Sequence, residues 1–147
     1  MWFRRIIPGI VALLVAAQFV SVDRTNHPIE QARTFYTVEN VSQKVQSLLD
    51  RSCSDCHSNQ TRWPWYSGVA PISWVVANDV HSARRKLNFS EWGKYSAKKR
   101  DHEKEEICNE VMEGDMPESK YAFIHRQSKL IADERATICE WTGSPRQ

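Results

Sequence analysis

The pentapeptide Cys53-Ser54-Asp55-Cys56-His57 constrains the fold of this chain more than any other feature. Two residues between the cysteines let both thiols reach neighbouring edges of one porphyrin, and the histidine that follows is carried beneath the metal at the centre of the ring. Chance matches are few because cysteine and histidine are both scarce, with 4 and 5 in the whole chain. The motif therefore predicts one covalently attached haem c, with its iron, held by Cys53, Cys56 and His57.

Two other interpretations of the motif stay open at this point. A redox-active dithiol also has the Cys-x-x-Cys spacing, but it follows a strand in a βαβ pattern, and the segment before Cys53 has a helical pattern. A zinc site needs a second pair of ligands at comparable spacing. Cys108 and Cys139 stand alone, without histidines at ligand spacing, so a zinc cluster is poorly supported.

The N-terminus fits an exported protein, as covalent haem attachment outside the bacterial cytoplasmic membrane requires. Arg4 and Arg5 precede an apolar run from Ile6 to Val22, which is short for a membrane-spanning helix and long for a signal-peptide core. We expect a transmembrane signal anchor over residues 1–22 in the cytoplasmic membrane, with the haem domain facing the periplasm. The alternative is cleavage after Ala17 and a soluble periplasmic protein.

The remaining chain has the length of one domain. We predict a tether over residues 23–37 and a haem c-binding domain over residues 38–147. A net charge of +2 and a pI near 8.4 are too mild to indicate nucleic-acid binding. The expected partners are the membrane, through the N-terminal anchor, and a redox protein in or at that membrane.

Helical periodicity dominates this domain, and no strand pattern is visible. Pro71 suits the first turn of a helix, Ser96 suits an N-cap and Gly114 suits a helix end. The fold class is therefore predicted as all-α, a small cytochrome c-like domain around one haem. The predicted helices cover residues 38–49, 71–87, 97–113 and 133–141. Polar residues of the second helix are interpreted as a solvated face: Asp79, Arg84 and Arg85.

Met116 is the best candidate for the sixth iron ligand, opposite His57. It lies in the polar loop Gly114-Asp115-Met116-Pro117, and thioether sulfur suits haem iron. Met112 lies on the apolar stripe of the preceding helix and is predicted to pack in the core. Three histidines are weaker candidates for the same iron position, in falling order: His125, His81 and His102.

An aromatic segment begins a few residues after the motif. Large flat side chains can cover a porphyrin, and indole, phenol and guanidinium hydrogens can bind haem propionates. Plain packing is the alternative role. The candidates for lining the haem pocket are Arg62, Trp63, Trp65, Tyr66 and Trp74.

Several short runs together resemble the bacterial haem-binding domain family, which contains short, exported, monohaem proteins. The resemblance extends from about Val22 to Trp141, and it implies that the two cysteines and the histidine of the motif hold haem. The order of elements is also broadly similar to class I cytochromes c, with a long insertion between Trp63 and Trp92. The runs that carry the resemblance are Cys53–Asn59, Trp63–Tyr66, Val69–Trp74, Leu87–Trp92 and Met116-Pro117.

Cys108 and Cys139 are expected to form a disulfide, because free thiols tend to pair in an oxidising periplasm. The alternative is two buried small hydrophobic residues.

Electron transfer through a haem ligated by His57 and Met116 is the predicted function, with no enzymatic activity. The alternative is a haem-based sensor or small-ligand-binding protein in which the Met116 bond is labile. A peroxidase would need polar catalytic groups at an open iron position, and the sequence offers no clear set.

Overall fold

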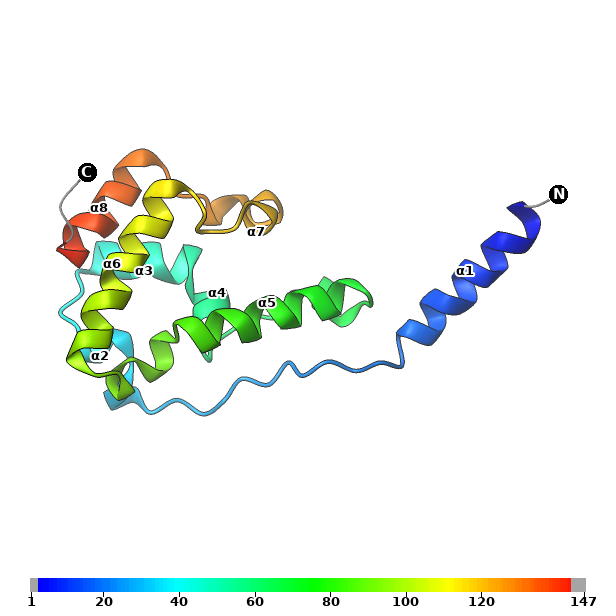
Figure 1. Cartoon of the computed structure of the whole chain (residues 1–147), viewed down its shortest axis with the longest axis horizontal. Helices are drawn as coiled ribbons and strands as arrows, with labels where there is room; N and C mark the ends of the chain where they lie inside the picture. Colours follow the sequence, from blue (N-terminus) through cyan, green and yellow to red (C-terminus); the bar gives the residue numbers. More distant parts are fainter. Residues whose placement is uncertain (1–2, 144–147) are drawn as a thin grey trace.

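Every regular element of the structure is helical (Figure 1). The structure is a computed structural model that describes residues 3–143, and no strand occurs in that range. The prediction of a small all-α domain is confirmed. Residues 1–2 and 144–147, the ends of the predicted leader and domain, lie outside the described residues, as do the side chains of Arg4 and Arg5.

Helix α1, Phe3–Ala17, stands apart from the other helices and is joined to them by an extended segment (Figure 1). Among the residues that the structure describes, no helix is both long enough and apolar enough to cross a membrane. The transmembrane anchor expected over residues 1–22 is therefore not supported by the structure.

The segment expected to be a tether is attached to the domain along its length. The His81 Nε2 atom lies 2.9 Å from the Asp23 carbonyl oxygen, and the Asn26 side chain donates to the Thr61 carbonyl at 2.9 Å. A short 3-10 helix, η1 (Gln31–Arg33), then leads into α2, Phe35–Val38. Phe35 is completely buried, so the packed domain begins before residue 38.

The helix predicted over residues 38–49 is divided into two elements, α2 and α3 (Gln43–Ser52). Residues 39–42 separate them, and the side chain of Ser42 caps the second helix by accepting a hydrogen bond from the Val45 N–H at 3.3 Å. The sequence pattern of apolar residues continued through the break. As predicted, α3 ends immediately before the motif.

The other three predicted helices are confirmed within a residue or two. They are α5 (Ile72–Lys86), α6 (Ala97–Glu113) and α8 (Ala132–Thr142). The Ser96 side chain caps α6, and Gly114 ends it in the left-handed conformation with a φ of 86°. Elements too short to show periodicity were not predicted: α4 (Ser54–His57), α7 (Ser119–Ile124), η2 (Trp65–Gly68), η3 (Phe89–Lys94) and η4 (Arg126–Ser128).

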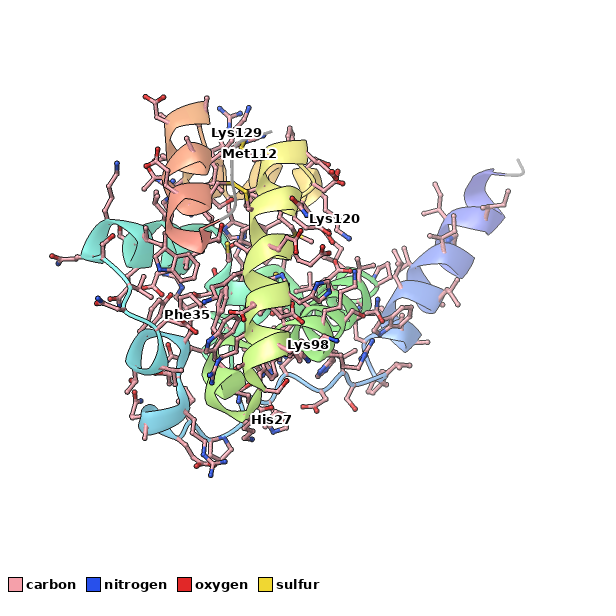
Figure 2. All side chains as sticks on the ribbon, turned by 60° about the vertical axis from the view of Figure 1, so that its left-hand side comes forward. His27, Phe35, Lys98, Met112, Lys120 and Lys129 are labelled. Atoms are coloured by element: carbon pink, nitrogen blue, oxygen red, sulfur yellow. A yellow bond between two sulfur atoms is a disulfide. The ribbon has the colours of Figure 1, made fainter. Side chains whose placement is uncertain are left out.

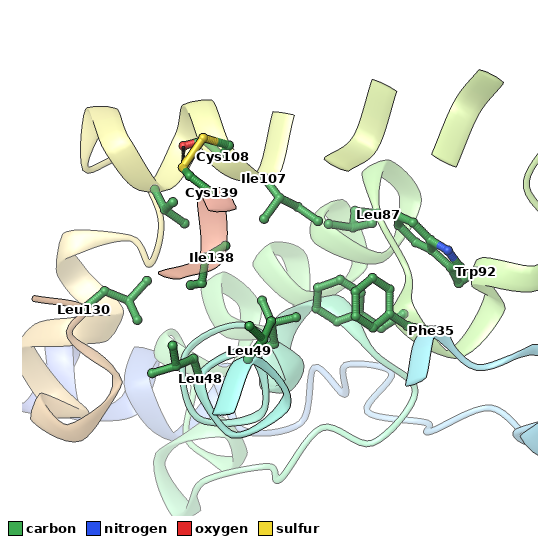
Figure 3. Packing of buried hydrophobic residues seen from close by; sticks show 13 residues of the cluster. Phe35, Leu48, Leu49, Leu87, Trp92, Ile107, Cys108, Leu130, Ile138 and Cys139 are labelled. Atoms are coloured by element: carbon green, nitrogen blue, oxygen red, sulfur yellow. Dashed lines mark hydrogen bonds between the residues drawn. A yellow bond between two sulfur atoms is a disulfide. The ribbon is translucent and has the colours of Figure 1, made fainter. Parts of the chain in front are cut away.

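The core lies where α3, α6 and α8 pack together, and it extends to α2 and η3 (Figure 3). Leu49 and Ile138 are completely buried at its centre. At the α2 end, the ring of Phe35 meets those of Trp92 and Trp141 edge to face, at centroid distances of 4.8 and 5.1 Å. This frame leaves one side of α6 facing α5.

A disulfide between Cys108 and Cys139 joins α6 to α8 (Figure 3). Cys108 itself is buried, as are Ile107 and Val111 on the same helix, but Met112 is 49% exposed. In the last turn of α6, Val111 is buried, whereas Met112 and Glu113 are exposed. The prediction that Met112 packs in the core is therefore wrong.

Candidate functional site

A cleft with two adjoining lobes lies between α5 and α6, and residues of α4 line it. The lobes have volumes of about 270 and 200 Å³, and together they are in the range of small-molecule sites, about 300–1,000 Å³. One lobe reaches toward α6, and the other lies against α5 and α7. Five residues line both lobes: Ser52, Cys53, His57, Met116 and Pro117.

His57, at the end of α4, is oriented by its hydrogen bond to the backbone. Its Nδ1 atom lies 3.1 Å from the carbonyl oxygen of Leu87, in the segment after α5. A carbonyl oxygen only accepts, so Nδ1 carries the hydrogen and Nε2 keeps its lone pair. Burial lowers the pKa of His57, which favours the neutral ring. The imidazole thus has the tautomer and charge of a metal ligand.

Cys53 and Cys56 are both free thiols at the cleft. Burial raises the pKa of Cys53 to about 12 and that of Cys56 to about 11. Both groups are therefore protonated at neutral pH, and because the thiolate is the reactive form, they resist oxidation and disulfide exchange. Cys53 is the residue that caps the short helix α4, Cys56 lies within that helix, and both line the same lobe as His57.

Met116 follows α6 and is held close to its end. The backbone N–H groups of Asp115 and Met116 both donate to the Glu110 carbonyl, at 3.0 and 3.1 Å. The left-handed turn at Gly114 makes this return of the chain possible. Met116 is half-buried and packs against the core. The loop is therefore fixed by the helix C-terminus.

The walls of the cleft are largely apolar. The apolar stripe of α5 faces it, and the side chains of Ile72 and Val75 remain 49% and 52% exposed there. Charged residues of the α6 lobe lie among the lining residues: Lys86, Glu103, Glu106 and Glu110. The remaining apolar lining comes from Pro64, Val76, Val80, Ala83, Leu87, Phe89, Ile107, Val111 and Ile124.

Comparison with known families decides the class of ligand. A family model described as a haem-binding domain matches residues 12–144. The chain belongs to the haem-binding domain family. The resemblance seen in the sequence is thereby confirmed, and this protein binds haem. No curated protein and no solved structure matches the chain significantly.

The cleft of the haem-binding domain fits such a group in chemistry as well as in size. A porphyrin is flat and apolar, and it would cover the exposed faces of Ile72 and Val75. The lone pair of His57 Nε2 is available to a metal. The hydroxyl of Ser52 is buried in the cleft and has no hydrogen-bond partner among the described residues, so a polar group of a ligand can satisfy it.

Only part of the aromatic segment after the motif lines the haem cleft. Arg62 and Tyr66 do so, whereas Trp63, Trp65 and Trp74 are not among the lining residues. Trp65 is 84% exposed, and the indole of Trp74 donates to the Val20 carbonyl at 3.4 Å. The indole N–H of Trp63 is buried without a partner in the described part of the chain.

The three other candidate histidines have different places relative to the haem cleft. His125 lines the lobe beside α7, but its Nε2 lies 2.6 Å from the Tyr66 hydroxyl, and its ring stacks on Tyr121 at 4.4 Å. His102 lines the α6 lobe from an exposed position. His81 lies outside the lining and is bonded to the Asp23 carbonyl.

Asp55, inside the motif, ties the haem cleft to α7, which the sequence did not indicate. Its carboxylate accepts hydrogen bonds from the Tyr121 hydroxyl at 2.8 Å and from Arg62 Nε at 3.0 Å. Burial raises the pKa of Tyr121, and the bond to Asp55 adds to this effect, so the phenol stays a donor. Tyr121 lies 66 positions after Asp55, so no local sequence pattern could indicate this hydrogen bond.

Arg84 is a second residue that the sequence misplaced. It was assigned to a solvated face of the helix, and that prediction is wrong, because its exposed fraction is only 9%. The guanidinium donates to the Ser58 carbonyl and the Thr61 hydroxyl, both just after the motif, at 2.8 Å each. It also donates to the Thr25 carbonyl and the Asn26 side chain, at 2.9 and 2.6 Å. Arg84 therefore fastens α5 to two loops beside the haem cleft.

Proposed function

We propose that this haem-binding domain is a monohaem c-type cytochrome that carries electrons through a haem ligated by His57 and Met116. One observation carries the proposal: His57 and Met116 line both lobes of the same apolar cleft, beside two free thiols. The histidine has a free Nε2 lone pair, and the methionine lies in a loop fixed by α6. A bond from each side would complete the coordination of an iron.

The thiols of Cys53 and Cys56 are the proposed attachment points. Each thiol would add across one vinyl group of a haem, with a carbon–sulfur bond formed and the thiol hydrogen transferred to the other vinyl carbon. Their high pKa keeps both in the thiol form until then. Two thioether bonds from one short helix would fix the position of the ring relative to His57.

Haem iron, when bound, exchanges single electrons between its ferric and ferrous states. The Leu87 carbonyl keeps the His57 ring in its orientation and makes Nε2 more basic through the bond to Nδ1. The thioether of Met116 raises the reduction potential. If His57 and Met116 both held the iron, no iron position would remain open to a substrate. This arrangement supports a carrier rather than an enzyme.

The proposed location is outside the cytoplasmic membrane, facing the periplasm, with a redox partner at that membrane. The reason is chemical, since Cys-x-x-Cys-His proteins receive haem after export, and the N-terminal apolar segment resembles an export signal. Fractionation with intact mass analysis tests this. Full-length protein in the membrane fraction would support an anchor, whereas shortened protein in the soluble periplasmic fraction would support cleavage.

Absorption spectroscopy with carbon monoxide tests the proposed function. The spectra of the oxidised and reduced protein are compared with those of Met116→Ala, and Met112→Ala serves as a matched control because Met112 is exposed. We expect a low-spin wild type with a sulfur-to-iron charge-transfer band and no response to carbon monoxide. Met116→Ala should lose the band and bind carbon monoxide, and Met112→Ala should do neither. A wild type that binds carbon monoxide readily would favour a sensor or ligand-binding protein instead.

A further inference from the structure

A separate pocket lies on the other side of the loop that carries Met116. Its volume is about 530 Å³, and α7 and the segment between α7 and α8 form most of its lining. Pro117 lines this pocket and also both lobes of the haem cleft. The pocket is therefore separated from the haem cleft by the residue next to the proposed iron ligand.

Three cationic side chains line the pocket, Arg126, Lys129 and Arg135, and no carboxylate is among its lining residues. None of the three forms a salt bridge with another described residue. Arg135 is half-buried, and its Nε donates to the Leu130 carbonyl at 3.4 Å. Because the net charge of the whole chain is only +2, three unpaired cations in one hollow are a local concentration of charge.

The same pocket has an apolar part. Phe123 lines it and is 77% exposed, and the buried side chain of Leu130 lines it as well. An exposed aromatic ring beside arginines is a common composition of the energetic centre of a protein interface. The hollow therefore offers an apolar contact surrounded by positive charge.

We propose that this pocket, the Arg126 pocket, docks an acidic segment of the redox partner, with an apolar side chain inserted beside Phe123 and carboxylates paired with Arg126, Lys129 and Arg135. The inference rests on the proposed function, because the partner is an electron donor or acceptor. Guanidinium groups bind carboxylates through two parallel hydrogen bonds, which fixes orientation. Opposite charges raise the association rate while leaving the complex short-lived, as electron exchange requires.

The concave shape favours a protein segment over an anionic membrane. A lipid surface is broad, and it attracts basic residues that project from the protein. In the Arg126 pocket the cations surround a hollow, where a protruding side chain can enter. The position next to Pro117 would bring the partner close to the haem.

The test is a calorimetric titration of the haem-loaded, full-length protein with a short synthetic peptide of glutamates and aspartates around one leucine. A peptide with lysines in place of the acids is the control ligand. Lys129→Glu is compared with Lys98→Glu, which reverses an exposed charge at the start of α6, far from the pocket at its other end (Figure 2). Reduction kinetics and carbon monoxide binding of each variant are recorded in parallel.

We expect the acidic peptide to bind and the basic one not to bind. Lys129→Glu should weaken binding about tenfold at low ionic strength, because it turns an attraction at about 6 Å into a repulsion. The effect should shrink at high salt, and Lys98→Glu should bind like the wild type. Equal binding by both variants, or no binding of the acidic peptide, overturns the inference. Binding to anionic vesicles that Lys129→Glu weakens, without peptide binding, would assign the surface to the membrane. Carbon monoxide binding by the wild type would instead reject the proposed function and leave the docking result standing.

Discussion

Replacing the buried Arg84 by methionine should destabilise the haem-binding domain more than replacing any exposed polar residue of α5. Arg84 is 9% exposed and forms no salt bridge with a carboxylate in the described part of the chain. Its guanidinium donates four hydrogen bonds, to Ser58, Thr25, Asn26 and Thr61. Methionine keeps the apolar stem and its packing, so the substitution removes mainly the donors.

The expected loss follows from where the four acceptors lie. Thr25 and Asn26 are exposed, so their acceptors return to water at little cost. Ser58 and Thr61 are buried, at 4% and 6% exposure, and a buried acceptor left unpaired costs about 1–3 kcal/mol. The Ser58 carbonyl loses its donor at a cost of about 2 kcal/mol, and the Thr61 hydroxyl, which still donates to the Asp55 carbonyl at 2.7 Å, loses one at about 1 kcal/mol. The variant also avoids the cost of burying a charged guanidinium, which offsets about 1 kcal/mol. We therefore expect the free energy of unfolding to fall by about 2 kcal/mol.

Unfolding in guanidinium chloride, followed by tryptophan fluorescence and circular dichroism, measures this loss of stability. Arg85→Met is the matched control, because Arg85 is the exposed neighbour on the same helix, and we expect a change within about 0.5 kcal/mol. Arg84→Lys should recover only part of the stability, since an ammonium group cannot reproduce the guanidinium fork. If Arg84→Met unfolds at the same denaturant concentration as Arg85→Met, the buried hydrogen bonds of Arg84 do not hold the two loops.

Two further predictions concern the frame behind the haem cleft. The disulfide closes a loop with a sequence separation of 31. The double variant Cys108→Ala/Cys139→Ala should therefore have a free energy of unfolding lower by about 3.5 kcal/mol. An unchanged melting temperature in calorimetry would contradict this. Glu134 of α8 forms an ion pair with Arg51 of α3 at 2.9 Å, and this interaction with Arg51 lowers the pKa of Glu134 below its ordinary 4.5. The unfolded chain then binds more protons than the folded one, so this contribution is present above pH 4.5 and disappears as the pH falls through the lower folded value. Glu134→Gln should therefore flatten the acid side of the stability curve, and a curve parallel to that of the wild type would count against the ion pair.

Features of the sequence that act over short distances were sufficient to predict much of the fold. The apolar repeats of α5, α6 and α8, the Ser96 cap and the glycine at 114 all act within a few residues, and the structure has these helices where they were expected. Ser42 shows the limit of such patterns. The apolar spacing ran past it, but α2 ends at Val38, and α3 begins only after Ser42, whose side chain accepts a hydrogen bond from the Val45 N–H.

Contacts between distant parts of the chain could not be predicted. The carbonyl of Leu87 orients His57 from 30 positions away, and a backbone oxygen has no signature in the sequence. Arg84 looked like a surface residue because its acceptors, two of them backbone carbonyls, come from other loops. Trp65 is the reverse case: it was predicted to line the pocket, but its side chain, at the start of η2, is exposed.

The position of Met116 in the haem-loaded protein is the most direct test of the central proposal. The chain has three methionines, and labelling their methyl groups with carbon-13 gives a separate nuclear magnetic resonance signal for each. In the reduced protein we expect one methyl signal shifted far upfield by the porphyrin ring, absent from Met116→Ala and retained in Met112→Ala. Three methyl signals at ordinary positions, or a shifted signal that survives Met116→Ala, would contradict ligation of the iron by Met116.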